Sequence, residues 1–411
     1  MGKLQQDAEP SDVGLDAERL QRIDRHFTAF VDEGRLPGFL VMVSRGGKVP
    51  YVATYGWRDV EQRLPVELDT LFRIYSMTKP ITSVAAMMLY EEGRFRLDEP
   101  VSTYLPEFAE LQVYAGGSSV NPITRPASEP MRIWHLLTHT SGLTYGFLYQ
   151  TVVDAIYRAR GFEWGSPRGA DLAGSCQGWA SLPLLFEPGT SWNYSVATDV
   201  VGRLVEVLSG QSLDRFFAER IFEPLGMDDT GFHLERDEDI NRLAVLYTPH
   251  PETGKAMPNT AMGRVGRVAP AVLSGGGGLV SSAGDYHRFT QMLLGGGELD
   301  GTRLLSPRTL AYMTENHLPG GHDIAWFGHP ISGEPDEGIG FGLGFSVTMD
   351  SVRHRALSSV GEFAWGGAAS TSFWVDPAED LTVVWMTQLL PSGTLPIKPR
   401  LQPLVYQAIV D

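Results

Sequence analysis

The sequence lacks the residues on which several kinds of protein depend. Cys176 is the only cysteine among 411 residues, which excludes an intrachain disulfide and a cysteine-ligated zinc or iron–sulfur site within one chain. The longest apolar runs, such as residues 84–90, are far shorter than the ~20 residues that span a bilayer. Residues 1–14 are polar and acidic and have no apolar core of the kind that a signal peptide needs. We therefore expect a cytoplasmic protein without membrane association.

Positive charge is also scarce. The chain has 33 Lys and Arg residues against 49 Asp and Glu residues, which gives a formal charge of −16. A phosphate backbone repels a protein of this sign, so we expect no nucleic-acid partner. The content of 43% hydrophobic and 20% charged residues is typical of a folded globular protein. The sequence leaves the oligomeric state open.

The two ends of the chain predict a sheet with flanking helices. Apolar residues recur at three- and four-residue spacing over residues 15–32, which predicts an amphipathic helix. Two apolar runs at 39–44 and 49–55 are joined by a glycine turn, which predicts a β-hairpin. Near the C-terminus the pattern predicts strand segments at 341–349, 370–375 and 381–387 and a last helix at 403–410.

The middle of the chain has a different pattern. From residue 98 to 285, helical patches alternate with long loops rich in Gly, Pro and Ser, and the clearest helices are expected at 133–137, 198–208 and 213–221. The whole pattern predicts an α+β (α/β) fold in which an antiparallel sheet, flanked by the terminal helices, carries a mostly helical insertion. We expect a sheet-containing domain of residues 15–75 and 286–411, a mostly helical domain of residues 76–285, and an active site at their interface.

The strongest local signal is Ser76-x-x-Lys79 at a predicted strand-to-helix junction. Residues three apart share one face of a helix, so the amine of Lys79 can reach the hydroxyl of Ser76. A serine hydroxyl becomes a good nucleophile only when a base takes its proton. Of the five lysines in the chain, only Lys79 has a serine three residues before it. Taken alone, the motif also describes a helix-capping serine followed by a solvated lysine.

Two further segments carry groups that suit the same chemistry. Tyr194 follows a Pro-Gly turn and precedes a predicted helix, where its phenol can move protons beside Lys79. Late in the chain, Trp365-Gly366-Gly367-Ala368 precedes a predicted strand, and its glycines allow a backbone N–H to approach a substrate oxygen. The alternatives are a half-buried tyrosine and a hairpin turn with a packed tryptophan.

In this order and spacing, these segments resemble the serine hydrolases of the penicillin-binding protein and class C β-lactamase superfamily. They are most similar to its esterase branch, the family VIII carboxylesterases. Segments around residues 134–143, 222–227 and 276–282 extend the resemblance over most of residues 15–410. The resemblance implies a β-lactamase/transpeptidase-like fold, a small ester as substrate, and no metal or cofactor.

The resemblance also implies a role for each residue. Ser76 would be the nucleophile that becomes acylated, Lys79 its base, and Tyr194 the group that passes the proton to the leaving group. The backbone N–H groups of Ser76 and Ala368 would form the oxyanion hole, and Trp365, Gly366 and Gly367 would line the substrate site.

Two departures from the superfamily pattern favour esters over β-lactams and peptides. The chain has Tyr194-Ser195-Val196 where a β-lactamase has Tyr-x-Asn, so the amide that recognises a β-lactam side chain is absent. It has Trp365-Gly366-Gly367 in place of Lys-Thr-Gly, which removes a cation expected to meet a substrate carboxylate. We therefore expect a serine carboxylesterase for short-chain or compact esters, with acyl transfer to an alcohol or amine as the related reaction. The alternatives are a β-lactamase or D-Ala-D-Ala peptidase on the same fold, and a catalytically silent binding protein, which the joint presence of the three catalytic residues disfavours.

Other motifs are interpreted as structural. His135 and His139 have the spacing of a zinc-binding helix, but Leu136 stands where a zinc protease has Glu. No Lys-Ser or Lys-Thr follows the glycines at 275–278, so a phosphate site is not expected there. The glycines at 338–344 suggest a close-packed strand. Two insert-like regions, 145–182 and 316–338, carry aromatic residues that line a hydrophobic acyl pocket or pack as local cores: Tyr145, Phe147, Tyr149, Tyr157, Trp164, Trp179, Trp326 and Phe327.

Overall fold

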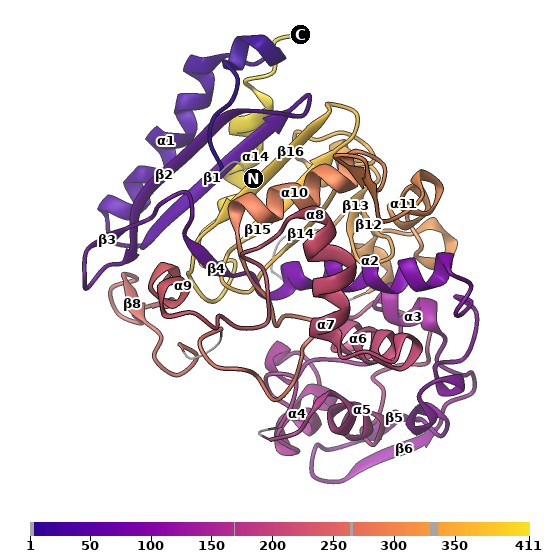
Figure 1. Cartoon of the computed structure of the whole chain (residues 1–411). Helices are drawn as coiled ribbons and strands as arrows, with labels where there is room; N and C mark the ends of the chain where they lie inside the picture. The colour runs from indigo at the N-terminus through magenta and orange to yellow at the C-terminus, as the bar shows by residue number, and fades with distance from the viewer. Residues whose placement is uncertain (1–3, 168, 264–265, 329–335) are drawn as a thin grey trace.

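The centre of the computed structural model is an eight-stranded antiparallel sheet built from both ends of the chain (Figure 1). The structure describes residues 4–167, 169–263, 266–328 and 336–411. The strand order is β12-β13-β14-β15-β16-β1-β2-β3, so β16 and β1 join the C-terminal and N-terminal halves. In that order the strands are Ile339–Phe341, Ser346–Thr348, Phe363–Gly366, Ser372–Asp376, Leu381–Met386, Gly38–Arg45, Lys48–Asp59 and Leu64–Pro65.

Strand β1 shows why the sheet is buried on both faces. Successive side chains of a strand point to opposite faces. Phe39 and Val41 therefore pack in one hydrophobic core, while Leu40 and Met42 pack in the other. All four side chains are fully buried. The continuous apolar run in the sequence thus reflects two cores, one on each side of the sheet.

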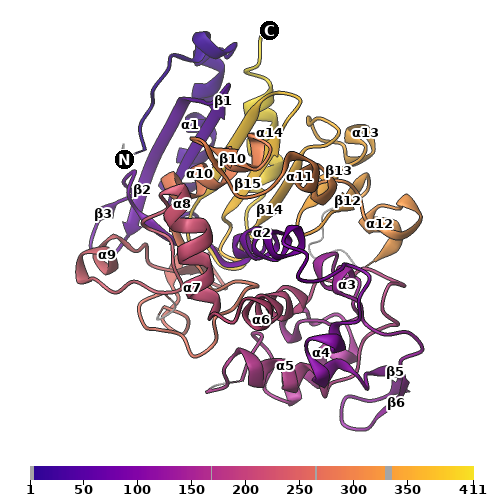
Figure 2. The ribbon, with the colours of Figure 1, turned by 45° about the vertical axis from the view of Figure 1, so that its right-hand side comes forward.

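Helices cover both faces of the sheet (Figure 2). On one face, α1 (Ala17–Asp32) packs against α14 (Ile397–Tyr406), and the buried residues Leu20, Ile23 and Phe27 of α1 form the apolar stripe that the spacing predicted. On the other face, α10 (Ala283–Leu294) packs on β15 and β16. The predicted pair of terminal helices on one sheet is confirmed.

The inserted region is built around α2 (Thr78–Glu91) and α6 (Ala197–Ser209), which pack against each other. Helices α3 (Ile133–Leu137) and α5 (Leu172–Ala180) also contact α6. The same region also contains α4 (Val152–Ala159), α7 (Leu213–Phe217), α8 (Glu223–Leu225) and α9 (Asp237–Arg242). Later in the chain follow α11 (Pro307–Met313), α12 (Ile324–Phe327) and α13 (Ser351–His354). Short strand pairs join β4 (Leu71–Arg73) to β9 (Val280–Ser282), β5 (Gln112–Gly117) to β6 (Pro122–Pro126), β7 (Tyr247–Pro249) to β8 (Ala256–Pro258), and β10 (Glu298–Leu299) to β11 (Thr302–Arg303).

Three predicted elements need correction. The last helix spans Ile397–Tyr406 and not residues 403–410. Proline is favoured in the first turn of a helix, which suggested a start at Pro403, but Pro403 lies inside the helix. The segment 341–349 contains the end of β12 and the whole of β13, paired as a hairpin. No strand was expected at β14, because Trp365 and Gly366, which belong to it, were interpreted as the segment before a strand or as a hairpin turn.

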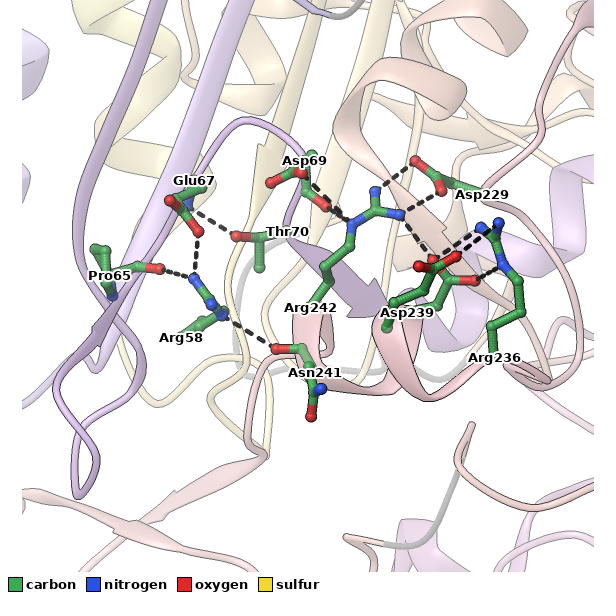
Figure 3. A network of polar contacts seen from close by, with 11 residues as sticks. Arg58, Pro65, Glu67, Asp69, Thr70, Asp229, Arg236, Asp239, Asn241 and Arg242 are labelled. Atoms are coloured by element: carbon green, nitrogen blue, oxygen red, sulfur yellow. Dashed lines mark hydrogen bonds and ion pairs between the residues drawn. The ribbon is translucent and has the colours of Figure 1, made fainter.

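A polar network connects α9 to the strands that lead to Ser76 (Figure 3). The guanidinium of Arg242 donates to both carboxylate oxygens of Asp229, at 2.8 and 2.7 Å, and to the carbonyl of Asp69 at 2.9 Å. Arg58 on β2 donates to the carbonyl of Asn241 at 3.3 Å. The bidentate pair fixes the guanidinium of Arg242 against Asp229. The hydrogen bonds to Asp69 and from Arg58 hold α9 against β2 and the segment before β4.

The division into a sheet domain (15–75 and 286–411) and a helical domain (76–285) stays our proposal. It is supported by the strand order, in which β1 and β2 adjoin strands from the other end of the chain. Among the described helices, none has the length and apolar character needed to cross a membrane.

Candidate active site

Ser76 lies where a short strand meets a buried helix. Strand β4 ends at Arg73, a 3-10 turn covers Tyr75–Met77, and α2 begins at Thr78. Tyr75 has a φ of 44°, in the left-handed region that few non-glycine residues adopt. Strain of this kind persists only where the surrounding structure imposes it, and it is concentrated at functional sites. The predicted strand-to-helix junction is confirmed.

Lys79 is 1% exposed and its amine is held by three groups. Nζ lies 3.3 Å from Ser76 Oγ and 3.2 Å from Tyr145 Oη, and it donates to the carbonyl oxygen of Gly276 at 2.7 Å. The spacing of the Ser-x-x-Lys motif therefore brings the amine to the serine hydroxyl. The solvated-lysine alternative is wrong, because Lys79 is buried.

Tyr194 approaches the same oxygen from the segment before α6. Its hydroxyl donates to Ser76 Oγ at 2.5 Å, and its ring centroid lies 4.5 Å from Lys79 Nζ. The neighbouring Asn193 fixes this segment, because its side-chain amide donates to the carbonyl of Leu143 at 3.2 Å and to the carbonyl of Tyr194 at 3.0 Å. Tyr194 and Lys79 thus converge on one serine oxygen.

The turn between β14 and β15 packs directly against the strand end before Ser76. A Cβ at Gly367 would lie 2.4 Å from the carbonyl oxygen of Ile74 and 2.2 Å from Thr371 Oγ1, so only glycine fits. The N–H of Ala368 makes no hydrogen bond within the described part of the chain. A free N–H beside the candidate nucleophile is what an oxyanion hole requires.

Two residues of the site, Asp199 and Gly276, were not indicated as such by the sequence, and Tyr145 was expected to line a pocket or to pack in a local core. Tyr145 Oη donates to Asp199 Oδ2 at 3.3 Å, and the N–H of Gly276 donates to Asp199 Oδ1 at 3.0 Å. Burial and the charge of Asp199 hold the pKa of Tyr145 well above its usual value. Ser274 Oγ also donates to Asp199 Oδ1, at 2.5 Å. The glycine run at 275–278 was the sequence signal for a close approach at this point. In the structure, a Cβ at Gly276 would lie 2.4 Å from Asp199 Oδ2.

A cavity of about 320 Å³ contains the candidate nucleophile. Ser76 and Tyr194 line it together with Phe147, and all of residues 364–368 contribute to its wall. The ring of Trp365 lies 5.6 Å from that of Tyr194, centroid to centroid. The structure thus brings together all the residues that the sequence indicated: Ser76, Lys79, Tyr194, Trp365, Gly366, Gly367 and Ala368.

The aromatic residues of the two insert-like regions divide between pocket and core. Phe147 lines the cavity and stacks on Tyr145 at 4.7 Å and on the exposed Trp164 at 5.4 Å. Tyr157 and Trp179 are fully buried and pack in the main core. Tyr149 and Trp326 are exposed, and Phe327 packs against the core. Residues 329–335 of the second region lie outside the described residues.

The two histidines at zinc-like spacing have structural partners. His135 Nδ1 accepts the N–H of Arg132 at 3.0 Å, and His139 Nδ1 lies 3.1 Å from Ser195 Oγ. Burial lowers the pKa of His135 to about 4 and, together with the charge of Lys79, holds the pKa of His139 well below its usual value. Both rings are therefore neutral at pH 7. The described residues contain no cluster of His, Cys, Asp and Glu arranged to hold a metal ion.

Comparison with known families supports the family resemblance that the sequence motifs indicated. The model of the β-lactamase family matches residues 23–406. The chain belongs to the β-lactamase family. Within this β-lactamase family, esterase EstB of Burkholderia gladioli is 34% identical to the chain over 415 residues, which cover 97% of the chain and 98% of the esterase.

Solved structures support the esterase branch of the β-lactamase family. EstCE1, described as a hydrolase with promiscuous acyltransferase activity, has a TM-score of 0.77 and 29% identity and covers 96% of the chain and 98% of its own. Unliganded simvastatin synthase (LovD) from Aspergillus terreus has a TM-score of 0.77, 26% identity and the same coverage. With EstB, these likenesses place the chain among the family VIII esterases and confirm the predicted β-lactamase-like α+β fold.

Proposed function

We propose that the protein is a serine carboxylesterase that hydrolyses compact carboxylic esters through an acyl-serine intermediate. The observation that carries the proposal is the convergence of Lys79 Nζ and Tyr194 Oη on Ser76 Oγ, at 3.3 and 2.5 Å. A nucleophile with two proton-transfer groups in hydrogen-bond reach is the arrangement that acyl transfer requires. The esterase and acyltransferase relatives support the same class of reaction.

In the acylation step, Ser76 Oγ attacks the carbonyl carbon of the ester while its one proton passes to the Lys79–Tyr194 pair. The N–H groups of Ser76 and Ala368 donate hydrogen bonds to the negatively charged oxygen of the tetrahedral intermediate and stabilise it. Tyr194 then gives a proton to the departing alcohol oxygen, and the C–O bond of the ester breaks. The acyl group is now bonded to Ser76.

In the deacylation step, a water molecule attacks the acyl-serine carbonyl carbon and gives its proton to the Lys79–Tyr194 pair. Collapse of the second tetrahedral intermediate returns the proton to Ser76 Oγ and releases the carboxylic acid. An alcohol or amine in place of water yields acyl transfer by the same steps. The acyltransferase relatives favour this second reaction as a companion of hydrolysis.

The size and walls of the cavity support compact substrates. About 320 Å³ is at the lower end of the range for small-molecule sites. Phe147 and Trp365 give it aromatic walls suited to apolar groups. The β-lactamase or peptidase alternative is disfavoured by Val196, which is fully buried and has no side-chain amide to recognise a peptide-like group.

A p-nitrophenyl phosphonate ester tests the proposal. Such a reagent phosphonylates an activated serine and stops at that covalent adduct. Peptide mass mapping should find one adduct per chain, on Ser76, together with loss of p-nitrophenyl acetate hydrolysis. The matched control is Ser83→Ala, which removes a buried serine of α2 seven residues after Ser76. It should leave both labelling and turnover in place, whereas an adduct on any other residue would refute the assignment of the nucleophile.

A further inference from the structure

The cavity that contains Ser76 is also lined by the segment that leads into α14. Ser392, Leu395, Ile397 and Lys398 contribute to its wall, as does Ser372 at the start of β15. These residues come from the opposite end of the chain to Ser76 and play no part in the proton transfers proposed above. Their chemistry therefore indicates which groups a substrate has besides the ester bond itself.

Lys398 and Ser372 give this part of the wall hydrogen-bond donors. Ser372 is 8% exposed, and its buried hydroxyl has no hydrogen-bond partner among the described residues. An unpartnered buried hydroxyl costs free energy that a ligand oxygen would recover. Lys398 supplies a cation in the first turn of α14, where the helix dipole also favours an anion.

Glu362 forms an ion pair with Lys398, with Oε1 at 3.5 Å from Nζ, so the charge of Glu362 bears on how far Lys398 is neutralised. Tyr406 Oη lies 2.8 Å from Glu362 Oε2 and 2.5 Å from Asp376 Oδ2. One hydroxyl has one proton and can donate to only one of these oxygens. The other contact is a hydrogen bond only if one of the two carboxyl groups holds a proton itself.

Both carboxyl groups also accept other hydrogen bonds. The backbone N–H groups of Ala378 and Glu379 donate to Asp376 Oδ1 at 3.0 and 3.3 Å. The side-chain amide of Gln402 donates to Glu362 Oε1 and Oε2 at 3.1 and 2.8 Å. Burial raises the pKa of Glu362, and the side chain is 2% exposed. The side chain of Lys398 is 33% exposed and its amine has three N–H donors, so it can contact a ligand in the cavity as well as Glu362. Asp336 also lines the cavity, and it already has an interaction partner.

We propose that Lys398 and Ser372 form a subsite for a carboxylate carried by the ester substrate. The substrate class is then a compact ester with a free carboxylate on its acyl or its alcohol part, such as a half-ester of a dicarboxylic acid or an acylated hydroxy acid. This inference rests on the proposed esterase function. It also supplies, from α14, the cation that Trp365 does not provide.

Matched pairs of esters test the subsite. For the alcohol part, 4-acetoxybenzoate is compared with 4-acetoxybenzamide, and for the acyl part, monomethyl succinate is compared with methyl succinamate. The members of each pair have similar shapes and differ in charge. In the unaltered enzyme, kcat/KM should favour the carboxylate member of at least one pair by about tenfold, as expected for one favourable charge contact.

The variants assign that preference to the proposed residues. Lys398→Met should abolish it, Ser372→Ala should reduce it, and Lys398→Arg should retain it. The preference is a ratio of two kcat/KM values measured on one variant, so a change that affects both esters of a pair equally cancels. Lys255→Met removes an exposed lysine elsewhere and serves as the charge control. An equal carboxylate preference in Lys398→Met and the unaltered enzyme, or no preference in either pair, would overturn the subsite. Absence of Ser76-dependent turnover of every ester would instead overturn the proposed function.

Discussion

The amine of Lys79 lies 3.2 Å from the hydroxyl of Tyr145, which in turn lies 3.3 Å from the carboxylate of Asp199. Asp199 also accepts the N–H of Gly276, whose carbonyl accepts a hydrogen bond from Lys79. Two chains of contacts therefore connect the buried carboxylate to the amine, one through a phenol and one through the backbone. We infer that this arrangement fixes the orientation of Lys79 toward Ser76.

Replacing Ser76 by alanine should abolish esterase activity. The variant keeps the backbone N–H groups and the cavity but has no atom that can form the acyl intermediate. We expect kcat for p-nitrophenyl butyrate to fall by at least about a thousandfold, to the residual level of an oxyanion hole without a nucleophile. Steady-state kinetics on purified protein measures this, and a variant that keeps more than a tenth of the activity would show that another residue attacks the ester.

Lys79→Ala and Tyr194→Phe should each lower kcat by about a hundredfold or more with little change in KM, because each acts in proton transfer and not in substrate binding. The two residues converge on one oxygen, so their effects should be far from additive. The double variant decides this point. A loss equal to the product of the two single losses would mean that the residues act independently.

Tyr145→Phe and Asp199→Asn test the positioning of the base. Neither residue lines the cavity, so KM should not change. Loss of the contacts that orient Lys79 should lower kcat by about tenfold, less than loss of Lys79 itself. Thr198→Ser, a conservative change beside Asp199 in α6, is the matched control and should leave kcat unchanged. An increase in KM without a change in kcat would place Asp199 in substrate binding instead.

The neighbouring glycines 276 and 277 provide a matched pair for packing. A Cβ at Gly276 would lie 2.4 Å from the buried Asp199 carboxylate, whereas a Cβ at Gly277 meets its nearest neighbour at an ordinary 3.7 Å. Gly276→Ala should therefore destabilise the fold by about 2 kcal/mol through overpacking, and Gly277→Ala should cost much less. Urea unfolding of both variants measures the difference. Equal effects of the two substitutions would show that the side chain of Asp199 can move away from the new Cβ at little cost in free energy.

Asp285 should make stability depend on pH. Burial raises the pKa of this carboxyl from 3.8 to about 7 in the folded state, although Thr230 Oγ1 and the N–H of Asp229 donate to it. Between these two values the folded state binds more protons than the unfolded state, so the contribution of Asp285 to stability is present below pH ~4 and is lost as the pH rises toward 7.

The test compares Asp285→Asn with the unaltered protein. The variant has no titrating group at this position, so its free energy of unfolding should fall less between pH 4 and 7 than that of the unaltered protein. Denaturant unfolding at pH 4.5, 6 and 7.5 gives both curves. Parallel curves would contradict the raised pKa of Asp285.

The sequence by itself determined the elements and the catalytic residues whose signal is local. The periodicity of residues 15–32 specified α1, because one helix face has to be apolar to cover a sheet. The pairing of Ser76 with Lys79 also follows from local geometry, because residues three apart on a helix face one another whatever the rest of the chain does. Tyr194 and the Trp365–Ala368 segment could be singled out from the sequence, and the resemblance to a known family then implied their roles.

Only the tertiary structure decided which distant residues surround these groups. Tyr145, Asp199 and Gly276 come from separate segments, and no spacing in the sequence indicates that a phenol, a carboxylate and a glycine carbonyl meet at Lys79. Lys398 is likewise an ordinary surface-type lysine in the sequence, yet the adjacency of β16 and β1 brings the C-terminal segment to the cavity of Ser76. Local propensity acts over a few residues, whereas the partners of a buried polar group are set by how the sheet and helices pack, which brings together residues far apart in the chain.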